Sequence, residues 1–244
     1  MDIWEIVVVG FAALLTSMLS AVAGLGGGVV LLGVLAQFHA PAVAIPLQGG
    51  IQIVSNSSRA GFLRRSVDWP VVARASILVL PASLAGVAVA TTVPEGVSRV
   101  VLGVFVLVLA WRPTLLRWRG GGTLPRGALV GVGGVAGFLN TTVGASGPVT
   151  SPFFKAVTAG HAAFVATAAA AQVVAHASKI LAFGLDGFDY GGFWPVLVVG
   201  ISGVVFGSWA GARLLGRLGE QDLTRLFRLV LTALAVRMLL LALL

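Results

Sequence analysis

Polar and cationic side chains recur at helical spacing inside two apolar stretches of this chain. They are Gln48, Gln52, Asn56 and Arg59 in the first stretch and, about 120 residues later, Gln172, His176 and Lys179 in the second. Steps of three or four residues place each set on one face of an α-helix. Because such side chains are costly in contact with lipid, each face should point toward protein or water. Amide and cationic groups donate hydrogen bonds, so the two faces together predict a binding site for a small anion.

A glycine-rich break precedes each polar face at the same offset along the chain. The residues that we expect to contribute are Gly24, Gly26, Gly27 and Gly28 in the first break and Gly144, Ser146 and Gly147 in the second. Glycine tolerates positive φ angles and lets the backbone approach a ligand closely. A helix that starts after such a break directs its N–H groups and positive dipole end at the break. We therefore predict one site built from both breaks and both polar faces, with Arg59 and Lys179 attracting the anion from opposite mouths.

Each of these features also has a simpler interpretation. Arg59 and Lys179 could extend to the membrane interfaces or set topology, and the amides could only join helices by hydrogen bonds. The glycines could serve close helix packing. The sequence has no HExxH motif, no Gly-x-Ser-x-Gly motif and no paired carboxylates at membrane depth. It therefore predicts no catalytic site, no metal site and no cofactor.

The composition indicates a membrane protein. Of the 244 residues, 58% are hydrophobic and 10% are charged, and the mean hydropathy is +1.03. Soluble domains carry roughly 25% charged residues. The net charge of +8 lies mostly in short loops between apolar segments, which is typical of topology signals rather than of nucleic-acid binding. The chain has no cysteine, which excludes disulfides and thiol chemistry.

Apolar segments of membrane-spanning length alternate with these loops. We expect them at residues 3–23, 41–63, 70–93, 95–111, 126–142, 160–183, 193–214 and 223–243, with shorter pieces at 29–38 and 149–159. A helix as short as the last two rises only about 15 Å, so each is either re-entrant or half of a broken crossing.

The basic loops predict the orientation of these segments. Arginines cluster at Arg64 and Arg65, at Arg112, Arg117, Arg119 and Arg126, and at Arg213, Arg217, Arg225 and Arg228. By the positive-inside tendency these loops are cytoplasmic, and the acidic loop 184–192 is outside. The sequence then predicts an all-α integral membrane protein of two inverted-topology repeats, with about five helical segments each and both termini outside. The repeats are residues 1–112 and 126–244, joined by a cytoplasmic linker at 113–125 into one transport unit. If the short pieces only re-enter, the count falls from ten crossings to eight.

Several segments with family-specific character follow one another in this chain. They are Ala23-Gly-Leu-Gly-Gly-Gly28, Asn56-Ser-Ser-Arg59, Arg64-Arg-Ser-Val-Asp68-Trp69, Gly137-Phe-Leu-Asn-Thr-Thr-Val-Gly144 and Leu-Gly-Glu220-Gln-Asp-Leu-Thr-Arg225. Their order and the duplication resemble the TauE/SafE sulfite exporter family over essentially the whole length. The resemblance implies transport of sulfite, sulfonates or related small anions. One departure is the second break, which reads Gly144-Ala-Ser146-Gly-Pro148 where the family usually approaches Gly-Gly-Gly.

These observations lead us to expect a transporter, not an enzyme. It would move sulfite or an organosulfonate such as sulfoacetate by alternating access around a midplane site. The alternatives are a channel of the same fold, a transporter of a carboxylate or sulfate, and, least favoured, a membrane-embedded enzyme or assembly factor. The expected partners are the small anion and the lipid bilayer of the cell inner (plasma) membrane, with no nucleic acid. The small-residue faces also allow a homodimer.

Overall fold

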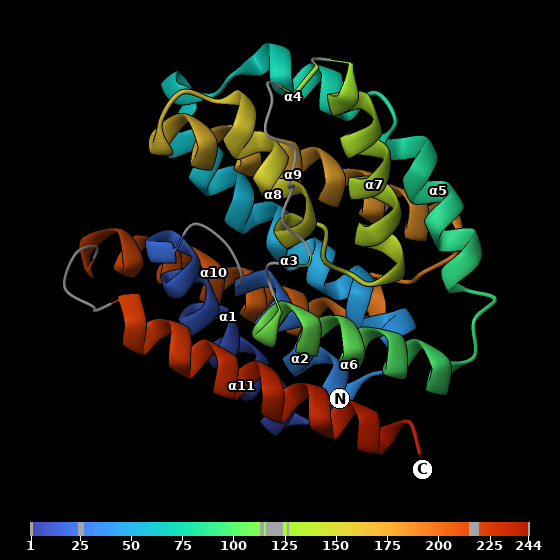
Figure 1. Ribbon diagram of the computed structural model, residues 1–244. Coiled ribbons are helices and arrows are strands. Elements are labelled where there is room, and N and C mark those ends of the chain that lie inside the picture. The colour runs from blue at the N-terminus through green and yellow to red at the C-terminus, as the bar shows by residue number, and fades with distance from the viewer. Residues whose placement is uncertain are drawn as a thin grey trace.

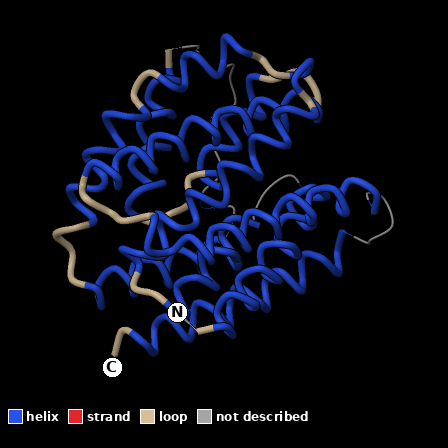
Figure 2. The backbone as a smooth tube through the Cα atoms, turned by 180° about the vertical axis from the view of Figure 1, so that it is seen from behind, coloured by secondary structure: helices blue, strands red, loops and turns tan. Residues whose placement is uncertain are grey.

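α-Helices make up nearly all of the chain. The computed structural model describes residues 2–23, 27–112, 115, 124–125, 127–214 and 220–243. The helices are α1 (Ile3–Ala23), α2 (Gly27–Phe38), α3 (Pro41–Phe62), α4 (Trp69–Ser76), α5 (Val79–Ala90), α6 (Glu95–Trp111), α7 (Ala128–Thr142), α8 (Gly147–Val157), α9 (His161–Leu185), α10 (Trp194–Leu214) and α11 (Glu220–Leu241). Short 3₁₀ turns lie at Arg64–Ser66 and Gly191–Phe193. Within the described part there is no β-strand, and loops are short (Figure 2). The predicted all-α membrane-type fold is confirmed.

One predicted segment differs from the observed helices. The sequence predicts a single helix over 70–93, whereas the structure divides it into α4 and α5, bent by 41°. Pro81 explains the break, because it has no N–H to bond with the carbonyl of Ile77 and its ring crowds that carbonyl. By length and composition, two described helical stretches can cross a membrane, at 161–185 and 191–211, and the bent α4–α5 pair adds a third. The total of ten crossings stays a prediction.

The two halves of the chain interleave in space. In Figure 1, α4, α5, α7, α8 and α9 gather above α3, and α1, α2, α6, α10 and α11 lie below it. The pairings are reciprocal: α1 packs against α10, α7 packs against α4 and α5, α3 packs against α9, and α6 packs against α11. Two halves related by a two-fold axis would pair in this way. The inverted topology itself stays a prediction.

Glycines allow the two cross-half pairs to approach backbone to backbone. A Cβ at Gly203 or Gly207 of α10 would collide with the carbonyl of Gly10 or Leu14 of α1. In the other pair, a Cβ at Gly133 or Gly137 of α7 would collide with a carbonyl of Ala75 or Val79. Each seam therefore places glycines one turn apart against a neighbouring main chain, as small residues do in membrane helix packing.

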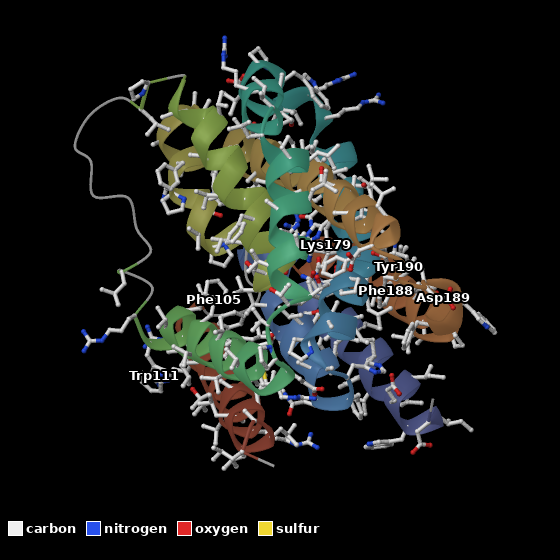
Figure 3. The ribbon with its side chains drawn as sticks, turned by 90° about the vertical axis from the view of Figure 1, so that its right-hand side faces the viewer. Phe105, Trp111, Lys179, Phe188, Asp189 and Tyr190 are labelled. Carbon is white, nitrogen blue, oxygen red and sulfur yellow. The ribbon has the colours of Figure 1, made fainter. Side chains whose placement is uncertain are left out.

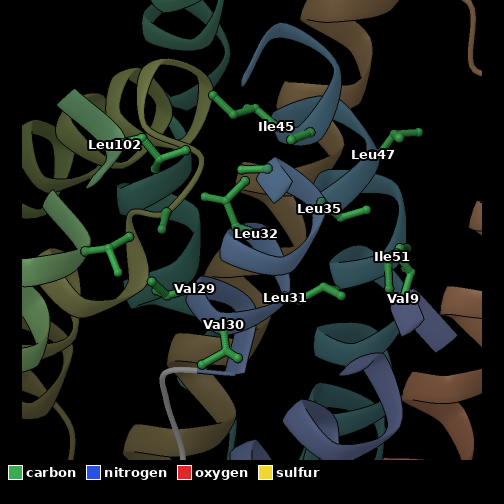
Figure 4. Close-up of a cluster of buried hydrophobic side chains, with 14 of the residues drawn as sticks. Val9, Val29, Val30, Leu31, Leu32, Leu35, Ile45, Leu47, Ile51 and Leu102 are labelled. Atoms are coloured by element: carbon green, nitrogen blue, oxygen red, sulfur yellow. The ribbon is translucent and has the colours of Figure 1, made fainter. Parts of the chain in front are cut away.

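The short helix α2 is enclosed by protein rather than placed at the periphery. Leu31, Leu32 and Leu35 are completely buried, with Leu31 and Leu35 pointing to one side of the helix and Leu32 to the other (Figure 4). Its neighbours are α1, α3 and α11. A helix that is apolar on all sides requires such enclosure. The packing fixes the N-terminus of α2, where the first glycine break ends.

Candidate functional site

A cavity of about 60 Å³ lies where both glycine breaks meet α3, α7 and α9. It is lined by Ser20, Gly28, Val29, Gln48, Gln52, Asn56, Arg59, Asn140, Gly144, Ala145, Ser146, Gly147, Pro148, Gln172 and His176. On the usual scale of buried water sites, this volume holds on the order of four water molecules. The cavity therefore suits a ligand of a few heavy atoms.

Ten of the fourteen residues predicted for the site line this cavity, so the duplicated pattern identified one place rather than two. They are Gly28, Gln48, Gln52, Asn56, Arg59, Gly144, Ser146, Gly147, Gln172 and His176. Gly27 lies beside the cavity, with its backbone N–H bonded to the Ser20 hydroxyl at 3.0 Å. Gly24 and Gly26 lie outside the described residues.

The two short helices present their first turns to the cavity. Gly28 and Val29 contribute from α2, and Gly147 and Pro148 contribute from α8. The positive ends of both helix dipoles are therefore at the cavity wall, where they favour an anion. A Cβ on Gly28 would lie 3.0 Å from Gln52 Nε2, so glycine lets the backbone sit directly against that amide.

Side-chain amides are held in place around the cavity. Gln48 Nε2 donates to the Gly28 carbonyl at 3.2 Å, which ties α3 to the first break. Gln172 and the Ser146 hydroxyl lie within hydrogen-bond distance, with Gln172 Nε2 to Ser146 Oγ at 3.3 Å, which ties α9 to the second. Asn56 Nδ2 donates to the Gln52 carbonyl one turn earlier. Each break is therefore braced by the polar face of its own half.

Lys179 occupies a different place from the one that we expected. Instead of lying at a mouth of the site, it is completely buried among the helices (Figure 3), and it is not one of the residues that line the cavity. Its Nζ donates to Gln48 Oε1 at 2.8 Å, to the Gly144 carbonyl at 3.2 Å and to the Ile45 carbonyl at 3.4 Å. Helical spacing identified its face correctly, but depth depends on how closely α9 packs on α3, which spacing does not contain. Its repeat partner Arg59 is half-buried and lines the cavity.

The segment after α9 folds back on the end of that helix. Phe188 makes an edge contact with Phe183, and the Tyr190 hydroxyl donates to the Ile180 carbonyl at 3.4 Å (Figure 3). Burial raises the pKa of the Tyr190 hydroxyl, so this group stays a donor at physiological pH. This segment was predicted from the sequence only as an acidic loop on the outside, and its aromatic packing was not predicted.

Two polar residues of the cavity were missed from the sequence. Ser20 and Asn140 both line it, and they are separated by the same 120-residue offset as the predicted pairs. Extending the repeat comparison to the helices before the breaks would have found them. Asn140 is completely buried, with Nδ2 3.5 Å from His176 Nδ1, and its Oδ1 has no hydrogen-bond partner among the described residues.

The wall of the cavity carries positive charge and many donors. Arg59 contributes a guanidinium group, and no aspartate or glutamate is among the described residues that line the space. The described part of the chain has no cluster of three or more potential metal-binding side chains. Donors from two helix starts, several amides and one cation form a site that can bind and desolvate an anion.

Comparison with known proteins identifies the family of the chain. The family described as sulfite exporter TauE/SafE matches residues 9–238. No curated protein sequence and no solved structure matches the chain. The match covers nearly the whole chain, including both breaks and both polar faces, and it confirms the resemblance drawn from the motifs. The chain therefore belongs to the TauE/SafE sulfite exporter family of membrane transporters.

Proposed function

We propose that this protein transports a small sulfur oxyanion, sulfite in preference to larger organosulfonates such as sulfoacetate, across the cell inner (plasma) membrane. The observation that carries the proposal is the cavity in which two helix N-termini and Arg59 converge and which no carboxylate of the described residues lines. Anions gain from both the dipoles and the guanidinium group, whereas cations and neutral solutes do not.

The size of the cavity favours the smallest member of the substrate class. On the scale of buried water sites, about 60 Å³ holds on the order of four water-sized groups, which matches the one sulfur and three oxygens of sulfite, whereas sulfoacetate has about twice as many heavy atoms. The amide and hydroxyl groups of Gln172 and Ser146 can rotate to meet oxygens in different directions. Sulfate and carboxylates are the competing substrates that a flux assay should include.

Alternating access is the transport mode that this arrangement supports. The cavity is lined by helices of both halves of the chain, and a shift of the helix group that contains α7 and α9 against the group that contains α1 and α2 would open it to opposite sides in turn. The unit would be residues 1–112 and 126–244 joined by a cytoplasmic linker, and a homodimer is compatible with it. A channel of the same fold is the second candidate.

Flux into proteoliposomes tests the proposal. Purified full-length protein should show saturable uptake of labelled sulfite, competed by unlabelled sulfite more strongly than by sulfoacetate, taurine, sulfate or carboxylates. Preloading the vesicles with sulfite should accelerate uptake, because a carrier exchanges substrate across the membrane and a channel does not. Uptake that neither saturates nor responds to preloading would favour the channel. Absence of anion flux, together with chemical conversion of an added compound, would favour a membrane-embedded enzyme.

A further inference from the structure

Lys179 is a completely buried cation outside the set of residues that line the cavity. Its ammonium group has three donors, and the structure supplies three acceptors: Gln48 Oε1 and the carbonyls of Gly144 and Ile45. All three acceptors are neutral. The ion pairs between described side chains are His39 with Glu5 and Arg99 with Glu95, so no described carboxylate pairs with Lys179.

The hydrogen bonds of Lys179 reach both glycine breaks. The bond to the Gly144 carbonyl holds the second break directly. The bond to Gln48 Oε1 fixes the orientation of that amide, whose Nε2 in turn donates to the Gly28 carbonyl in the first break. Gly28, Gln48 and Gly144 all line the cavity. One buried ammonium group therefore connects the two halves of the anion site without lining it.

We propose that Lys179 is a positioning residue that fixes both breaks and supplies a positive potential to the cavity from behind its wall. This inference rests on the proposed function. A buried charge is costly unless it is compensated, and neutral hydrogen bonds compensate it only in part. An anion in the cavity would complete the compensation of this charge. Only the lining residues Gln48 and Gly144 separate the cavity from the ammonium group, in a region of low dielectric constant. Affinity for the anion should therefore depend on the charge of Lys179 as well as on its hydrogen bonds.

Three substitutions separate charge from hydrogen bonding. Lys179→Gln keeps a donor but removes the charge, Lys179→Met removes both, and Lys179→Arg keeps both. Sulfite binding to purified full-length protein should weaken roughly 10- to 100-fold in the Gln and Met variants, and Arg should recover most of the lost affinity. The unfolding temperature without anion should fall less in Gln than in Met, because Gln still satisfies one acceptor.

A substitution that leaves the charge in place supplies a second test. A Cβ on Gly49 would lie 2.7 Å from Lys179 Cδ, so Gly49→Ala displaces the side chain, and Gly49 is not a lining residue. Gly61→Ala is the matched control on the same helix, since a Cβ there meets nothing within 4 Å. Gly49→Ala should weaken sulfite binding severalfold, and Gly61→Ala should bind as the wild type does. This pair remains informative if the Lys179 variants do not fold.

Two results would overturn the inference. Wild-type affinity in Lys179→Gln would show that charge is unimportant, and equal loss in Gln, Met and Arg would show that only the shape of lysine matters. Failure of the proposed function gives a different result, because the wild-type protein would then show no saturable sulfite binding or flux.

Discussion

Arg59 and Lys179 are equivalent in the repeat but occupy different environments. Arg59 is half-buried at the cavity wall, whereas Lys179 is completely buried and holds three acceptors. The residue that makes the difference is Gln48, which binds Lys179 from the facing helix. The position equivalent to Gln48 in the second half is Ala168, whose side chain has no acceptor. Both positions carry a cation, but Arg59 lines the cavity, whereas Lys179 bonds to Gln48 of the facing helix and does not line it.

The largest effect is expected from a substitution at Gly144, whose carbonyl accepts a hydrogen bond from Lys179. This residue has φ of +72°, and a Cβ would lie 2.5 Å from Leu32 Cδ2. Gly144→Ala should destabilise the protein by about 3 kcal/mol and abolish transport, because backbone strain and overpacking act together. Gly160→Ala is the control, with φ of +87° and open space around it, and should cost only about 1 kcal/mol. Equal shifts in unfolding temperature for the two variants would contradict this account.

The next largest effect is expected at Arg59, which lines the cavity, and it distinguishes this residue from Lys179, which does not. Arg59→Gln should lower sulfite flux by about 100-fold, because the guanidinium group is part of the cavity wall. Its unfolding temperature should change little compared with that of Lys179→Met. Arg65→Gln, at an exposed position shortly after α3, is the control and should transport at the wild-type rate. If Arg59→Gln retains full flux in proteoliposomes, the assignment of roles to the two cations is wrong.

A smaller effect is expected at Asn140 in the second half. Asn140→Ala removes a buried amide from the cavity and from the vicinity of His176, and should weaken sulfite affinity about fivefold. Thr142→Ala is the matched control in α7, because Thr142 is not a lining residue and its hydroxyl bonds only within its own helix. Isothermal titration with sulfite measures both. Equal affinities in the two variants would argue against a ligand contact at Asn140.

The smallest effect is expected at Ser20, the counterpart of Asn140 in the first half. Its hydroxyl accepts from the Gly27 N–H at the start of α2. Ser20→Ala should lower stability by about 1 kcal/mol and change the flux by less than about threefold, because the loss is that of one helix-start hydrogen bond. Thermal unfolding and uptake assays measure the two quantities. A larger loss of sulfite flux in Ser20→Ala than in Asn140→Ala would contradict the expectation that Asn140 matters more for transport than Ser20.

Periodicity and duplication were sufficient to predict the helices, the breaks and most of the cavity wall. They worked because a 3.6-residue period and a repeat offset are properties of the sequence itself. The break between α4 and α5 was not predicted, although Pro81 is a residue type that breaks helices. The depth of Lys179 was not predicted either, because it depends on which helix faces α9 and on the side chain at Gln48. Nor does apolar sequence reveal which helices pair, since lipid-facing and protein-facing surfaces have similar composition.

The glycine seams between α1 and α10 and between α7 and the α4–α5 pair have a mechanical consequence. Where two main chains touch, there is no side chain that can change rotamer, so each seam resists sliding and its helices move as one stiff block. Any relative movement of the helices must then occur elsewhere, at the contact of α3 with α9 and at the glycine breaks that end on the cavity. The stiffness of these two seams thus confines any displacement to the contacts between the helices that surround the anion.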